Sequence, residues 1–249
     1  MAVLETDGAR IHYEVRGTGH PLVLFAPGGM HSVAQLWRER PDAPGERMPW
    51  IDPPGELSDE FRVVAMDQRN AGASTAPVRA GDGWESYTAD HLALLAELGA
   101  DQAHAMGGCI GSSYALALCQ AAPDRVTAAV LQNPIGLSAD NRGSFYAMFD
   151  GWAKALVAER PDVTEDAVSA FRERMFGGDF VFSVDRDFVR RCPVPLLVLA
   201  GNDQFHPRAT AEEIAELAPD AELVIEWAGP ARHDETLERV REFLRRHTP

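Results

Sequence analysis

Short apolar runs recur along this chain, and segments with helical periodicity separate them. Each run is four to six residues long and apolar at nearly every position. That length suits a buried strand better than a buried helix. Strands that are apolar throughout are typical of a parallel sheet covered by helices on both faces, so the pattern predicts an α/β fold with a mostly parallel central sheet. The runs are residues 21–26, 62–66, 103–106, 126–131, 196–200 and 223–227.

The two ends of the chain complete this pattern. Residues 4–7 and 11–15 read as two strands joined by a turn at Asp7-Gly8, which predicts an antiparallel hairpin at one edge of the sheet. Helical spacing predicts helices over 84–98 and 110–121, and a closing helix over 234–247 with Asp234 as its N-cap.

One long segment interrupts the alternation of strands and helices. Residues 137–191 fall between two core strands and contain helical patterns at 145–159 and 164–175. We expect a helical cap or lid inserted in a core built from residues 1–136 and 192–249. Packing without a lid function is the alternative. A chain of 249 residues otherwise fits one domain.

Charge and cysteine content exclude several classes of function. The formal net charge is -15, which argues against binding to nucleic acid or to an anionic membrane. No apolar stretch is long enough to cross a bilayer, and the N-terminal residues lack the pattern of a signal peptide. Three irregularly spaced cysteines give no disulfide framework and no CxxC pair. We expect a cytoplasmic protein with free thiols.

The strongest chemical signal lies where the strand at 103–106 meets the following helix. The sequence Gly107-Gly-Cys109-Ile-Gly111 requires a sharp turn that strains the cysteine backbone and demands small flanking residues. At the start of a helix, the dipole and free N–H groups favour a thiolate. We therefore predict that Cys109 is a nucleophile. A small structural cysteine is the alternative, and it is the interpretation we favour for Cys119 and Cys192.

Two further loops carry candidate partners for this thiol. Asp203 directly follows the apolar run at 196–200, where a carboxylate can hold a histidine in the required tautomer. His233 lies in a loop with glycine and proline before the last helix, and we predict that it takes the proton from Cys109 and later activates water. A surface aspartate in a turn and a solvated loop histidine are the alternatives.

The glycine-rich turn after the strand at 21–26 is suited to bind an oxyanion. Such a site needs backbone N–H donors that already point at the developing charge. We assign this role to the N–H groups of Gly29 and Ile110, with Met30 as the second choice to Gly29. An ordinary strand-to-helix turn is the alternative.

Together these residues resemble the α/β-hydrolase superfamily over nearly the whole chain. The nucleophile turn matches residues 107–111, the acid loop 203–207, the histidine before the final helix His233, and the oxyanion loop 27–30. Residues 67–74 resemble a structural turn of the family. The family usually has serine where this chain has Cys109. Cysteine nucleophiles in this fold are similar to those of dienelactone hydrolases and polyhydroxyalkanoate synthases, and the subfamily stays open.

The resemblance implies hydrolysis of a carboxylic ester, lactone or thioester through a Cys-His-Asp triad and a thioacyl-enzyme. Transfer of the acyl group to another acceptor, or ligand binding without chemistry, are the alternatives. No cofactor and no metal is implied, and the oligomeric state is not predicted. The expected partner is a small substrate with an apolar acyl or aryl group. Candidate substrate contacts are Met30, His31, Phe149, Trp152 and His206.

Overall fold

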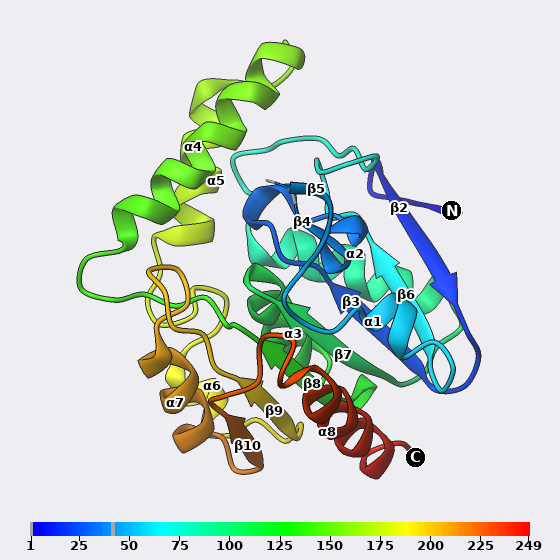
Figure 1. Ribbon diagram of the computed structural model, residues 1–249. Helices are drawn as coiled ribbons and strands as arrows, with labels where there is room; N and C mark the ends of the chain where they lie inside the picture. The colour runs from blue at the N-terminus through cyan, green and yellow to red at the C-terminus, as the bar shows by residue number, and fades with distance from the viewer. Residues whose placement is uncertain (1, 41–42) are drawn as a thin grey trace.

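A computed structural model describes residues 2–40 and 43–249 of the chain. Its centre is an eight-stranded sheet in the order β1-β2-β6-β3-β7-β8-β9-β10, which lies among the helices (Figure 1). The six strands from β6 to β10 in this order run parallel to one another, whereas β1 pairs antiparallel with β2 and β2 pairs antiparallel with β6. The predicted α/β fold with a mostly parallel sheet is confirmed.

The strand bounds follow the predicted runs closely. The strands are β1 Ala2–Thr6, β2 Ala9–Arg16, β3 Pro21–Phe25, β4 Glu39–Arg40, β5 Ala43–Arg47, β6 Arg62–Met66, β7 Ala103–Gly108, β8 Val126–Gln132, β9 Leu196–Leu199 and β10 Ala221–Val224. The small strands β4 and β5 form a separate hairpin. The last strand ends at Val224 rather than at residue 227.

Three of the α-helices, α1, α6 and α7, were not predicted from the sequence. The helical segments are η1 Gly29–His31, η2 Ala34–Trp37, α1 Pro53–Glu56, α2 Trp84–Glu97, α3 Ile110–Ala121, η3 Pro123–Arg125, α4 Arg142–Glu159, α5 Glu165–Phe176, α6 Arg186–Val189, α7 Arg208–Leu217 and α8 His233–Arg246. Among the described residues, no helix has both the length and the apolar character needed to span a bilayer.

The predicted N-cap of the last helix is wrong. Helix α8 begins at His233, and Arg232 occupies the cap position. Asp234 lies in the first turn, where its carboxylate bonds the ring of His233 instead of the free N–H groups. The negative charge of Asp234 in the first turn still interacts favourably with the helix dipole.

Alternate residues of each central strand enter two separate cores. In β6, Val63 belongs to the core on one face, and Val64 belongs to the core on the other. Helices α2, α3 and α7 cover the face that contains Val64. Helix α8 covers the opposite face through Val240, Phe243 and Leu244. Both faces are therefore dry, which explains why the strands read as continuous apolar runs.

The segment predicted as a cap, residues 137–191, contains α4, α5 and α6 between β8 and β9. We call it the helical insertion. In Figure 1, α4 and α5 lie side by side and rise away from the sheet at the upper left. Their facing aromatic side chains pack together, with Phe149 and Phe171 edge to face at 5.3 Å between ring centres. This aromatic packing holds the two helices as one unit.

Candidate active site

Cys109 occupies the sharp turn between β7 and α3. Its backbone has φ 58° and ψ −121°, a strained conformation for a residue with a side chain. A Cβ at Gly107 would lie 2.0 Å from the carbonyl oxygen of Gly111, and a Cβ at Gly111 would lie 1.9 Å from that of Phe25. Only glycine fits at these two positions. The small residues that flank Cys109 in the sequence therefore follow directly from the tightness of the turn.

The environment of Cys109 favours the thiolate. The residue is half-buried, and burial alone raises the pKa of its thiol. The charge of His206 and hydrogen bonding to its ring, together with the backbone N–H groups of Ile110 and Gly28, outweigh burial and lower the pKa. A thiolate at the start of α3 is also stabilised by the helix dipole.

His206 is held by Asp203 within a single tight turn. The ring Nδ1 lies 2.8 Å from both carboxylate oxygens of Asp203. One of these oxygens also accepts the backbone N–H groups of Phe205 at 2.9 Å and of His206 at 3.1 Å. The hydrogen bond from His206 lowers the pKa of Asp203 to about 2. One carboxylate therefore both builds the turn and orients the imidazole.

His206 also interacts electrostatically with Cys109. Burial lowers the pKa of His206, but the charges of Cys109 and Asp203 and hydrogen bonding to both raise it to about 10. Nε2 is buried and, among the described residues, has no partner with good hydrogen-bond geometry. The two groups are thus close enough for their charges to interact but are not well aligned. Such contacts often tighten only when substrate binds.

The role predicted for His233 is corrected by the structure. Its Nδ1 lies 3.0 Å from Asp234 and its Nε2 3.1 Å from Glu56, so both ring nitrogens have carboxylate partners away from Cys109. The N–H of Gly229 bonds the carbonyl of Pro49 at 2.8 Å, which ties the loop before α8 to the segment after β5. His206, predicted only as a substrate contact, is the histidine that interacts with Cys109.

A sequence signal for His206 existed. His206 follows Asp203 by three positions, a spacing that lets a turn place the imidazole beside the carboxylate. Gly201 carries a further signal, since a Cβ there would lie 2.3 Å from the Cβ of His206. The glycine after β9 makes room for the histidine.

The glycine-rich loop after β3 lies beside the thiol. Gly28 has φ 115° and its N–H favours the thiolate of Cys109. Gly29 and Met30 open the short helix η1, whose first N–H groups have no partner within the helix. The N–H groups of Gly29 and Ile110 remain our assignment for the oxyanion. Met30 is buried, and His31 is exposed to solvent.

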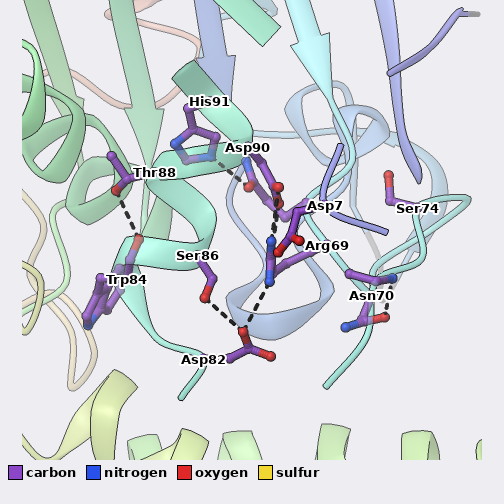
Figure 2. A network of polar contacts seen from close by, with 12 residues as sticks. Asp7, Arg69, Asn70, Ser74, Asp82, Trp84, Ser86, Thr88, Asp90 and His91 are labelled. Carbon is purple, nitrogen blue, oxygen red and sulfur yellow. Dashed lines mark hydrogen bonds and ion pairs between the residues drawn. The ribbon is translucent and has the colours of Figure 1, made fainter. Parts of the chain in front are cut away.

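The turn at residues 67–74 is hydrogen-bonded to the segment that follows this loop. The N–H of Gln68 bonds the carbonyl of Ser32 at 3.0 Å. Next to it, Arg69 makes a buried two-pronged pair with Asp90 at 2.8 and 3.0 Å and approaches Asp82 at 3.5 Å, as Figure 2 shows. A buried pair of this kind fixes the turn that supports the oxyanion loop.

Helix α4 contacts the oxyanion loop. A Cβ at Gly29 would lie 2.3 Å from the sulfur of Met148, so this side chain packs directly on the loop. Of the predicted substrate contacts, Phe149 and Trp152 are buried in the aromatic packing of the insertion. The indole N–H of Trp152 donates to the carbonyl of Asn70 at 3.2 Å, which docks α4 on the core.

The described residues contain no group of three or more His, Cys, Asp or Glu side chains arranged to hold a metal ion. A cysteine at a strained strand-to-helix turn, with a glycine-rich loop beside it and an aspartate in the loop after a later strand, is the arrangement that the sequence resemblance implied. The family model for the alpha/beta hydrolase fold matches residues 21–194. The chain belongs to the α/β-hydrolase fold family.

Relatives of this α/β-hydrolase include enzymes that act on different bonds. It is 28% and 30% identical to proline iminopeptidases from two strains of Xylella fastidiosa, over 70% of this chain and 53% of theirs. The chain thus spans about half the length of these relatives. It is also 26% identical to the acetyltransferase component of an acetoin cleaving system from Cupriavidus necator, over 98% of this chain and 67% of that protein.

Solved structures of the same fold align with nearly the whole chain. A meta-cleavage product hydrolase from Pseudomonas fluorescens aligns with a TM-score of 0.70 at 20% identity, over 99% of this chain and 98% of the other. An enol-lactonase from Burkholderia xenovorans aligns with a TM-score of 0.66 at 20% identity, over 98% and 100%. At this identity the likeness establishes the fold alone. The family match ends at residue 194, before the loop of Asp203 and His206.

Proposed function

We propose that this chain is a cysteine-dependent hydrolase of carboxylic esters, lactones or thioesters. Cys109 is the nucleophile, His206 the general acid and base, and Asp203 the group that orients the imidazole. The observation that carries the proposal is the mutual effect of Cys109 and His206. The charge and ring of His206 lower the pKa of the thiol, and the charge of Cys109 together with the hydrogen bond to Asp203 raises the pKa of the imidazole to about 10, so each group favours the charged form of the other.

In the first step, the thiolate of Cys109 attacks the carbonyl carbon of the substrate and a C–S bond forms. The N–H groups of Ile110 and Gly29 bind the resulting oxyanion. His206 then donates its Nε2 proton to the leaving alkoxide or thiolate as the C–O or C–S bond of the substrate breaks. The products of this step are an alcohol or thiol and a thioacyl-enzyme, with His206 neutral.

In the second step, neutral His206 takes a proton from water, and the hydroxide attacks the thioacyl carbon. The same N–H groups hold the second oxyanion. The bond to the sulfur of Cys109 breaks, the carboxylic acid leaves, and the thiolate–imidazolium pair is restored. The nucleophile must stay reduced throughout, so we place this activity in a reducing compartment such as the cytoplasm.

The helical insertion supports an apolar substrate. Met148 packs on the oxyanion loop, and Phe205, next to His206, packs edge to face on Phe145 of α4 at 5.2 Å. We propose that an acyl or aryl group reaches Cys109 beside these apolar side chains and that the insertion acts as a lid. The names of the relatives and neighbours, which include a lactonase and a peptidase, set the range of bonds that a test should cover.

The test is a panel of esters, lactones, thioesters and proline amides, assayed with wild type and Cys109→Ala. Intact-protein mass spectrometry after brief mixing with a slow ester should show one acyl adduct on wild type and none on Cys109→Ala. Adduct formation with release of free acid supports hydrolysis. An adduct that is discharged only when an alcohol, amine or thiol is added favours acyl transfer. No adduct and no turnover with any substrate would contradict the proposal.

A further inference from the structure

Asn141 precedes helix α4 but does not cap it with its side chain. The residue occupies the N-cap position and is buried, with 4% of its surface exposed. Asparagine is a favoured N-cap because its side-chain oxygen can accept a free N–H of the first turn. In this chain that oxygen accepts the N–H of Ser138 at 2.8 Å. The amide nitrogen is therefore free to donate elsewhere.

The amide nitrogen of Asn141 joins two loops at the ends of the sheet strands. It donates to the carbonyl of Gly136, after β8, and to the carbonyl of Gln204, after β9, both at 2.8 Å. A buried amide with two donor bonds and one acceptor bond leaves little freedom to either loop.

Gln204 lies inside the turn that holds His206. Asp203 and His206 bond each other through their backbones at 3.2 and 3.3 Å, with Gln204 and Phe205 between them. The carbonyl of Phe205 also accepts the N–H of Gly136 at 3.2 Å. Asn141 thus fixes the backbone from which the imidazole projects. The carboxylate of Asp203 is largely exposed and, by itself, orients only the ring relative to the turn.

We infer that Asn141 is a positioning residue that aims His206 at Cys109 by holding the carbonyl of Gln204. Because Asn141 starts α4, the base is placed by the same helix whose Met148 packs on the oxyanion loop. The inference rests on the proposed function of Cys109 and His206. It adds that the helical insertion contributes to the alignment of the catalytic groups as well as to covering them.

The test is the pH dependence of alkylation of Cys109 by iodoacetamide, located by peptide mass spectrometry. Cys119 and Cys192 are buried, so Cys109 is the accessible thiol of the three. The main variant is Asn141→Asp, which keeps the acceptor for Ser138 but loses both donor bonds. At neutral pH it should react about tenfold more slowly than wild type, because the pKa of Cys109 rises when His206 is displaced.

A second variant separates positioning from stability. In Asn141→Ser, the new hydroxyl is a good N-cap for α4, but its shorter side chain cannot reach both carbonyls. Its alkylation profile should shift in the same direction as that of Asn141→Asp, even if its melting temperature is unchanged. Ser144→Ala is the matched control, because it removes only the exposed bond from the side chain of Gln204 to the same helix, at 3.1 Å. Its profile should match wild type.

The outcomes distinguish this inference from the proposed function. A wild-type Cys109 that titrates as an ordinary thiol, with no change in His206→Ala, would overturn both. A lowered pKa in wild type that rises in His206→Ala but is unchanged in Asn141→Ser would overturn the inference alone. Raised values in His206→Ala and in both Asn141 variants, with Ser144→Ala unchanged, are the expected result.

Discussion

The exchange of roles between His206 and His233 can be tested with two alanine variants. His206→Ala removes the imidazolium that lowers the pKa of Cys109, while burial still raises that pKa. With a pKa at or above the usual value of about 8.5, less than about 3% of the thiol is ionised at pH 7. A wild-type thiol that is mostly ionised would therefore lose about 30-fold in reactivity from this effect alone.

Loss of the proton donor adds to this effect. General acid–base catalysis contributes about 10²–10⁴-fold, so kcat/KM of His206→Ala should fall by at least about 10³-fold, or about 4 kcal/mol of transition-state stabilisation. His233→Ala removes only partly exposed ion pairs to Glu56 and Asp234. It should change stability by less than about 1 kcal/mol and leave kcat/KM close to wild type.

The assay is steady-state kinetics on one ester over a range of pH. Wild-type activity should rise as Cys109 ionises and should fall as pH increases through about 10, where His206 loses its proton. His206→Ala should lose the basic limb. An inactive His233→Ala that keeps its fold by circular dichroism, beside an active His206→Ala, would refute the assignment and restore the order of residues that the family resemblance implied.

Three further predictions concern the nucleophile and the buried charges. Cys109→Ser should lose most activity because a hydroxyl gives up its proton less readily than a thiol, and equal kcat/KM would show that sulfur is not required. Asp90→Ala should lower the free energy of unfolding by about 3–5 kcal/mol in urea denaturation, since it leaves Arg69 buried without its two-pronged partner, and a loss below about 1 kcal/mol would count against that pair. Burial lowers the pKa of His91 and of His104 to about 3, whereas the unfolded chain binds these protons near pH 6.5. The free energy of unfolding should therefore decrease as the pH is lowered from about 6.5 to about 3, by about 1.4 kcal/mol per pH unit for each histidine. In His104→Gln, the slope of this decrease should be about half that of wild type.

The fold was predictable because its strands are buried on both faces. Alternate residues of β3 and β6 enter two different cores, so every position of each strand must be apolar, and a run of this kind is visible in the sequence. Helix α7 was not predicted because it buries only Thr210, Ala211 and Ile214, which leaves few large apolar residues to mark a helical period in its sequence. The start of α8 was misplaced because aspartate is a favoured N-cap residue, whereas the carboxylate of Asp234 bonds the ring of His233 instead.

The site was predictable where geometry is local and not where it depends on distant contacts. The turn around Cys109 is dictated by two glycines within five residues, so the sequence reveals it. The position of His233 depends on the bond between Gly229 and Pro49, which are far apart in the chain. No local pattern reports that bond. The resemblance to a family then favoured the histidine in the familiar place over the one beside Asp203.

The histidine beside Asp203 also gives a reason for a cysteine at position 109. The side chain of Asp203 is 60% exposed, so water screens its charge and weakens its support of an imidazolium. A serine would add no negative charge in the resting enzyme and would depend on this screened carboxylate alone. A thiolate supplies a second negative charge of its own, and the pKa of His206 rises largely through it. We therefore expect a base held on this exposed turn to serve a thiol better than a hydroxyl, which would link the proposed cysteine nucleophile to the position of its proposed partner.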